Sequence, residues 1–156
     1  MEYKDTIKIT GLIKAVLKDA NGKIKGIREV KNTITNVSFA VFAGLAGAVD
    51  TQTAFTYLAL GIGTTASAAT DTALGTEITD SGLARHAATV TRETTTLTND
   101  TLQLDYTWTA SGSKAVTEAG VLNAASVGVL AGRQVFTALA AKSSDTIQIT
   151  YKFKFA

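Results

Sequence analysis

The last third of the chain alternates apolar and polar residues with a period of two. The apolar positions of the two clearest stretches are Leu102, Leu104, Tyr106 and Trp108, and then Ile147, Ile149, Tyr151, Phe153 and Phe155. Threonine, glutamine, aspartate and lysine fill the positions between them. Because side chains of a β-strand point alternately to its two sides, each stretch is predicted to be a strand with one buried and one solvent-facing side. The solvent-facing sides carry hydroxyl groups and no pairing of a nucleophile with a base.

Turn residues divide the rest of the chain into further short elements. The expected strands cover residues 6–18, 23–31, 55–62, 87–97, 101–110, 115–122 and 130–139, and a last strand follows the turn at 143–145. Asn21-Gly22 is typical of a tight hairpin turn, because both residues tolerate a positive φ. Residues 37–49 have apolar residues at four-residue spacing, which predicts a short helix buried on most sides, with a hydrophobic strand as the alternative. Thr35 or Asn36 is expected to cap this helix.

These elements predict a mainly β fold, either an antiparallel β-sandwich or a jelly-roll-like barrel. Residues 1–31 are expected to form an N-terminal β-hairpin arm, and residues 32–156 a β-sandwich domain. The arm has eight basic and four acidic residues, a surplus of +4, which leaves −2 for the rest of a chain whose net charge is +2. Such an arm is suited to docking on the next copy; alternatively, its lysines keep an exposed hairpin from pairing edge to edge with other chains.

Composition excludes several classes of function. The chain has no cysteine, which excludes disulfides and thiolate chemistry. Its longest apolar run, residues 37–49, is shorter than the roughly 20 residues of a membrane span, and its start does not resemble a signal peptide. The product is therefore expected to stay in the compartment where it is made, without a membrane partner. A net charge of +2 is too small to predict specific nucleic-acid binding.

The sequence motifs give little support for a nucleotide-binding or metal-binding site. Gly61 and Gly63 follow a predicted strand, with Ala66 where a dinucleotide loop has its third small residue. The residues that follow do not open a long helix, and no acidic residue ends a second strand about 20 residues on. A structural turn is therefore the better interpretation. His86 is the only histidine and has no clustered ligands, so it is expected at a strand start or a subunit contact and not at a zinc site.

Glu118 is the most conspicuous charged residue, because it interrupts a run of small residues. It needs a cationic partner, which Arg133 or Arg85 would supply as a structural ion pair or an interface contact. Trp108 and Tyr106 would suit a stacking platform for sugars or bases, but the apolar side they share with leucines favours core packing. The sequence accordingly predicts no catalytic, cofactor-binding or metal-ligating residues.

Three segments together resemble a family of small structural proteins from tailed bacteriophages and prophages. They are residues 32–36 with the apolar helix after them, residues 55–65 continuing through 69–77, and residues 116–123 leading to 131–136 and the final strand. The resemblance implies a virion component, namely a capsid decoration protein or a small tail, tail-tip or fibre subunit, without an active site. Five residues match the shared pattern and are interpreted as shaping turns and buried or interface contacts: Gly61, Gly63, Glu118, Gly120 and Arg133.

The expected function is therefore structural. The protein would be made in the cytoplasm of the host bacterium and would assemble in many copies, as a homo-oligomer such as a trimer, with other capsid or tail proteins. The alternative is a receptor- or carbohydrate-binding module at a tail fibre tip, which would need Trp108 and Tyr106 to be accessible. A third hypothesis, a glycan hydrolase, would draw its paired carboxylates from acids such as Glu77, Asp80, Glu93, Asp105 and Glu118.

Overall fold

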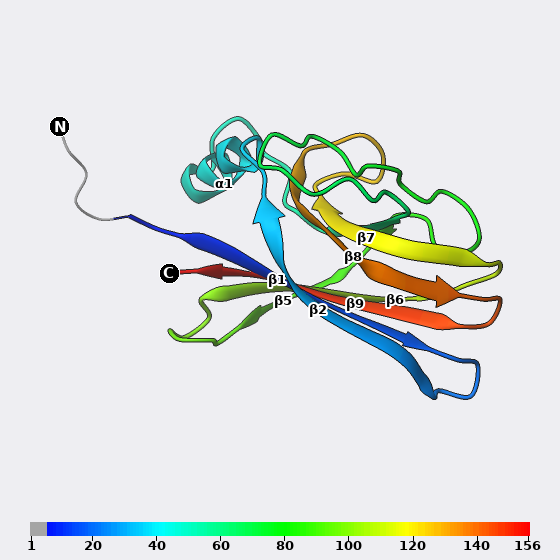
Figure 1. The fold of residues 1–156 in the computed structure, drawn as a ribbon. Coiled ribbons are helices and arrows are strands. Elements are labelled where there is room, and N and C mark those ends of the chain that lie inside the picture. Colours follow the sequence, from blue (N-terminus) through cyan, green and yellow to red (C-terminus); the bar gives the residue numbers. More distant parts are fainter. Residues whose placement is uncertain (1–5) are drawn as a thin grey trace.

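A computed structural model describes residues 6–156 of the chain. Within these residues, strands wrap around one core and a single helix lies beside them (Figure 1). The helix is α1 (Ser38–Gly47), and the strands are β1 (Ile9–Lys18), β2 (Ile24–Ile34), β3 (Tyr57–Gly61), β4 (His86–Ala87), β5 (Thr89–Glu93), β6 (Thr101–Thr109), β7 (Lys114–Leu122), β8 (Leu130–Ala141) and β9 (Thr146–Phe155). The predicted mainly β fold is confirmed.

The strands form one antiparallel sheet that closes almost completely. Their order is β4-β3-β7-β8-β2-β1-β9-β6-β5. The two outermost strands, β4 and β5, are consecutive in the chain and separated only by Ala88, so the two edges of the sheet meet in one stretch of backbone. β2 pairs with β1 over most of its length but with β8 only at Thr33 and Ile34. The result is a barrel-like wall whose two halves face each other across the core.

The core contains the alternating residues that the sequence pattern singles out. On β9, Ile147, Ile149, Tyr151 and Phe153 are fully buried. Leu104 and Trp108 of β6 are also buried, whereas Leu102 and Tyr106 are half-buried and pack against the same cluster. The period of two thus predicts correctly which side of these strands faces inward.

Of the predicted N-terminal hairpin, residues 1–5 lie outside the described part of the chain; residues 6–31 do contain the hairpin, but it is part of the barrel wall. β1 pairs with β9 residue by residue, from Ile9 opposite Phe155 to Lys18 opposite Thr146. Its inward side chains, among them Ile13 and Leu17, are buried in the core. β2 also runs three residues past the expected boundary at residue 31, to Ile34. The hairpin therefore does not stand apart from residues 32–156, because its apolar side is needed to complete the core.

Helix α1 forms where it is expected but with different capping and burial. Its N-terminal boundary residue is Val37, without a side-chain cap, because the Thr35 hydroxyl instead donates to the Leu130 carbonyl of β8. Val41 is buried, whereas Phe39 and Leu45 are 49% and 38% exposed. The expectation that α1 is buried on most sides is therefore wrong. No helix within residues 6–156 is long and apolar enough to cross a membrane.

Two irregular segments interrupt the succession of strands, and one of them shortens a predicted strand. Residues 62–85, between β3 and β4, form no helix and only an isolated bridge of Gly61 to Glu77. The strand expected through residue 97 ends at Glu93. The loop after it folds around Asp100, whose carboxylate accepts hydrogen bonds from the backbone N–H groups of residues 95–97 at 2.8–2.9 Å. These backbone groups are thus paired with a side chain instead of a neighbouring strand.

Candidate functional site

Four of the five residues that match the resemblance meet at one buried carboxylate. Glu118 on β7 is fully buried, and Arg133 on β8 is only 2% exposed. The Arg133 guanidinium donates to Glu118 Oε2, with N–O distances of 2.9 and 3.1 Å. Arg85, the other partner that the sequence allowed, instead forms a bidentate pair with Glu77 at 2.6 and 2.9 Å. The structure thus makes Arg133 the partner of Glu118.

Glu118 also binds the backbone of the irregular segment. Its carboxylate accepts hydrogen bonds from the N–H groups of Gly63 at 3.0 Å, Gly75 at 3.0 Å and Thr76 at 2.8 Å. A Cβ atom on Gly61 or Gly63 would lie 2.4 Å from Glu118 Oε1, which is too close for any side chain. Glycine is therefore required at both positions for the chain to approach the carboxylate.

Gly120 lies beside this cluster and serves the packing of β7. It is opposite Arg133 in the β7–β8 ladder. A Cβ atom there would lie 2.8 Å from Leu74 and 3.1 Å from Leu130, both of which are buried. Gly120 thus makes room for an apolar contact and does not touch the Glu118 carboxylate.

Asp71 completes the ion cluster and was not singled out by the sequence. Its carboxylate accepts from Arg133 at 2.5 Å and from the Ala68 N–H at 2.8 Å, while Arg133 also donates to the Thr65 carbonyl at 2.9 Å. Burial alone would raise the pKa of Asp71, but the Ala68 N–H and the Arg133 guanidinium together lower it below its ordinary value. Burial likewise opposes the charge of Arg133, yet Asp71 and Glu118 raise its pKa. Asp71 and Arg133 are therefore both held in their charged forms.

The cluster fixes the course of residues 62–76 across β7 and β8. Both oxygens of the Glu118 carboxylate accept hydrogen bonds from protein groups. Among residues 6–156, no group of three or more carboxylate and imidazole side chains is arranged to hold a metal ion. The cluster is built as an anchor for backbone.

The aromatic residues proposed for stacking are mostly unavailable. Trp108 is only 3% exposed, and its indole N–H donates to the Ala84 carbonyl at 2.8 Å. Core packing is thus confirmed for Trp108. Tyr106 is half-buried and stacks on the exposed imidazole of His86, with ring centroids 3.9 Å apart. His86 begins β4, which confirms its expected place at a strand start.

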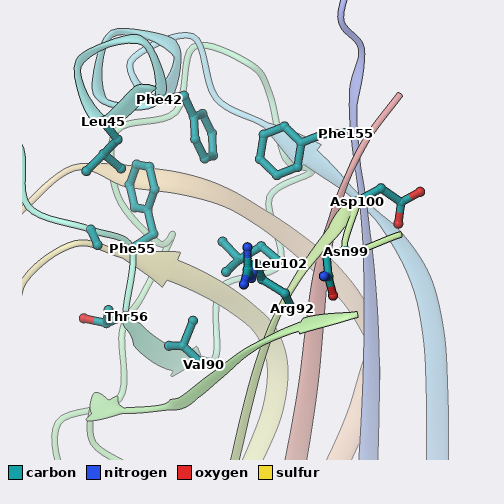
Figure 2. A pocket seen from close by; sticks show the side chains of 11 residues that line it. Phe42, Leu45, Phe55, Thr56, Val90, Arg92, Asn99, Asp100, Leu102 and Phe155 are labelled. Atoms are coloured by element: carbon teal, nitrogen blue, oxygen red, sulfur yellow. The ribbon is translucent and has the colours of Figure 1, made fainter. Parts of the chain in front are cut away.

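An open apolar groove lies beside α1 (Figure 2). Phe42 of α1 points down into a group of aromatic rings, 5.0 Å from Phe55 and 5.7 Å from Phe155 between centroids. Val90 of β5, which is 40% exposed, lines the groove farther along, and Arg92 and Asp100 mark its polar end. Sequence patterning does not reveal this groove, because its walls come from four separate parts of the chain.

Leu45 also lines this groove, and α1 and the turn after it carry further exposed apolar side chains. Phe39, Leu45 and Val49 are 49%, 38% and 53% exposed, and residues 37–49 contain no charged residue. We call Phe39, Leu45 and Val49 together with the Val90 side of the groove the α1 face. A surface helix normally carries charged residues on its solvent side, so the α1 face is unusual for a surface that only contacts water.

Comparisons with known proteins give no further guidance. No family model matches the chain, and neither curated proteins nor solved structures include a significant match.

Proposed function

We propose that this protein is a structural virion component of a tailed bacteriophage, which assembles in many copies through subunit contacts on the capsid or tail. The observation that carries the proposal is the α1 face, a charge-free helix that leaves large apolar side chains exposed beside an apolar groove. Burying such side chains against a partner is favourable by about 25 cal/mol per Å² of apolar surface. The resemblance to phage structural proteins, carried by residues 32–36 with the apolar helix, 55–65 with 69–77, and 116–123 with 131–136 and the final strand, supports the same function.

Two of the carboxylates that a glycan hydrolase would draw on are engaged in structural contacts. The Glu118 carboxylate is hydrogen-bonded to Arg133 and to backbone N–H groups, and Asp105 accepts hydrogen bonds from Gln148 and Thr150. The carbohydrate-binding alternative loses its expected platform because Trp108 lies in the core.

The decisive experiment measures assembly directly. Light scattering of the purified protein gives its oligomeric state, and the protein is then added to capsids and to tails that lack it. We expect an oligomer that joins one of these particles, and a Leu45→Glu variant that stays folded by circular dichroism but neither self-associates nor joins the particle. Val127→Glu is the matched control, because Val127 is 86% exposed and lies on the loop between β7 and β8.

Two results would count against the proposal. One is a wild-type monomer that joins neither capsids nor tails, and the other is a Leu45→Glu variant that assembles as well as the control. Deleting residues 1–31 is not a suitable test of assembly, because it removes β1 and with it buried core residues such as Ile13.

A further inference from the structure

Four lysines gather on the outer side of the barrel wall. In the ladder, Leu12 of β1 lies between Lys31 of β2 and Lys152 of β9. Lys154 follows Lys152 on the same side of β9, and Lys8 precedes β1. These side chains line one shallow groove, which shares no residue with the groove of the α1 face. We call Lys8, Lys31, Lys152, Lys154 and Leu12 the lysine face.

The four lysines of the lysine face form no ion pair within the described residues 6–156. The ion pairs that lysines form there are Lys14 with Glu29, Lys25 with Asp145 and Lys114 with Asp80, and none involves the four lysines of this face. One wall of the groove is formed by the loop at Thr95. In this loop the Asp100 carboxylate accepts hydrogen bonds from three backbone N–H groups. Glu93 lies beyond Thr101 on the neighbouring strand and accepts from Thr91. Four cations therefore share a groove whose lining contains no carboxylate.

The composition of the lysine face distinguishes between classes of anionic partner. Proteins that bind single-stranded nucleic acid stack bases on aromatic rings, and arginine forks commonly hold phosphates. The groove contains neither aromatic residues nor arginine. Instead, Leu12 is 43% exposed at its centre, which suits a partner with both carboxylates and an apolar side chain. A polypeptide offers that combination, whereas a phosphate backbone does not.

We infer that the lysine face is a docking site for an extended acidic segment of a partner polypeptide. Alternate residues of an extended chain lie about 7 Å apart, and Lys152 and Lys154 have the same spacing along β9. A segment with acidic residues at alternate positions can thus place successive carboxylates over these lysines and an apolar side chain over Leu12. This inference does not depend on the virion role, because it rests on a surface that the α1 face does not include.

The test is a binding titration with a defined probe. A fluorescein-labelled peptide that alternates glutamate with threonine and carries one central leucine is titrated with the full chain at low salt, and anisotropy is measured. We expect saturable binding that K31Q/K152Q/K154Q weakens about tenfold or more, since each lost pair of exposed charges weakens binding about two- to fivefold. Leu12→Thr should also weaken it, because the apolar contact is lost. The control K18Q/K23Q/K142Q removes the same charge elsewhere and should leave binding unchanged.

Other outcomes overturn the inference. No binding to the wild-type chain excludes the site, and an equal loss in both triple variants shows that only net charge matters. A single-stranded DNA of about 20 nucleotides serves as the competing probe. If the DNA binds more tightly than the peptide, and if its affinity is unchanged by Leu12→Thr, the lysine face is a nucleic-acid surface. Leu45→Glu tells the two proposals apart. If this variant fails to assemble but still binds the peptide, the lysine face acts independently of the α1 face.

Discussion

The barrel wall and the segment of residues 62–85 are stabilised in different ways. In the wall, β9 pairs residue by residue with β1 and β6, and it buries every second side chain from Ile147 to Phe153. The segment has apolar anchors at Leu74, Ile78 and Leu83 but little regular pairing, and its backbone is tied to the wall by charged side chains. Stability in the wall is therefore spread over many similar contacts, whereas in the segment it is concentrated in a few groups.

This difference shows how an irregular chain can be held as firmly as a sheet. One carboxylate, Glu118, takes the place of a ladder by accepting three backbone N–H groups that no strand pairs. Such an arrangement is efficient but fragile, because a buried ion that loses its partner is costly. Substitutions in the two regions should consequently differ in which part of the chain they cause to unfold locally.

The largest effect is expected for Glu118→Gln. It removes the charge that faces Arg133, which is 2% exposed, and should lower the free energy of unfolding by about 3–5 kcal/mol. Urea unfolding measures the loss, and hydrogen exchange should show Gly63, Gly75 and Thr76 amides opening before those of β9. Glu29→Gln breaks an exposed pair with Lys14 and should cost at most about 1 kcal/mol. Equal losses in both variants would contradict the anchoring role of Glu118.

A comparable but delocalised effect is expected for Ile149→Ala. Ile149 is fully buried in the middle of β9, and truncation should cost about 2–5 kcal/mol through lost burial and the cavity left behind. Exchange of the Gly63, Gly75 and Thr76 amides should rise only in step with global unfolding. Thr107→Ala, on the exposed side of neighbouring β6, is the control and should change stability by less than about 1 kcal/mol. Selective opening of residues 62–85 in Ile149→Ala would remove the distinction between the two regions.

A smaller, pH-dependent effect is expected for Asp71→Asn. The pKa of Asp71 in the folded protein lies below its ordinary value of 3.8. Its ionised form therefore stabilises the fold at pH values above 3.8. That contribution disappears as the pH falls through the lower folded pKa. The wild type should exceed Asp71→Asn by about 1–2 kcal/mol at neutral pH, and the difference should shrink below about pH 3.8. Urea unfolding across this range measures it; a difference that grows on acidification would refute the assignment. Asp50→Asn, at an exposed position, is the control.

The sequence predicts the wall far better than the segment, for a physical reason. A period of two is a local signal, so the inward sides of β6 and β9 can be read from neighbouring residues such as Ile147 and Ile149. The hairpin turn at Asn21-Gly22 is local in the same sense. By contrast, the pairing of β1 with β9 joins residues more than a hundred positions apart, and no local pattern shows that the hairpin completes the core.

The candidate site was predictable only in part. A buried glutamate among small residues requires a cation, which narrows the choice to Arg133 or Arg85. The sequence does not decide between them, because the answer depends on the β7–β8 register that sets Gly120 opposite Arg133. Asp71 lies in a stretch of small residues without any periodicity, so nothing marked it as a third member. The exposure of α1 also escaped prediction, since an apolar helix has the same pattern whether a partner or the core covers it.

The smallest expected effect is a gain in the free energy of unfolding. It tests backbone strain in the loop between β7 and β8, which the Arg85 side chain contacts. Val127 lies between β7 and β8 with a φ of +56°, which β-branched residues rarely adopt, and its carbonyl accepts from Arg85 at 2.8 Å. Val127→Asn should raise the free energy of unfolding by about 0.5–1 kcal/mol, because asparagine tolerates this conformation and the carbonyl is unchanged. Arg85→Lys in the same background should abolish the gain if the guanidinium imposes the strained backbone. Urea unfolding of the two variants and the double variant measures this coupling. A gain that survives Arg85→Lys would mean that the strain belongs to the turn itself and that charged anchors do not dictate backbone conformation here.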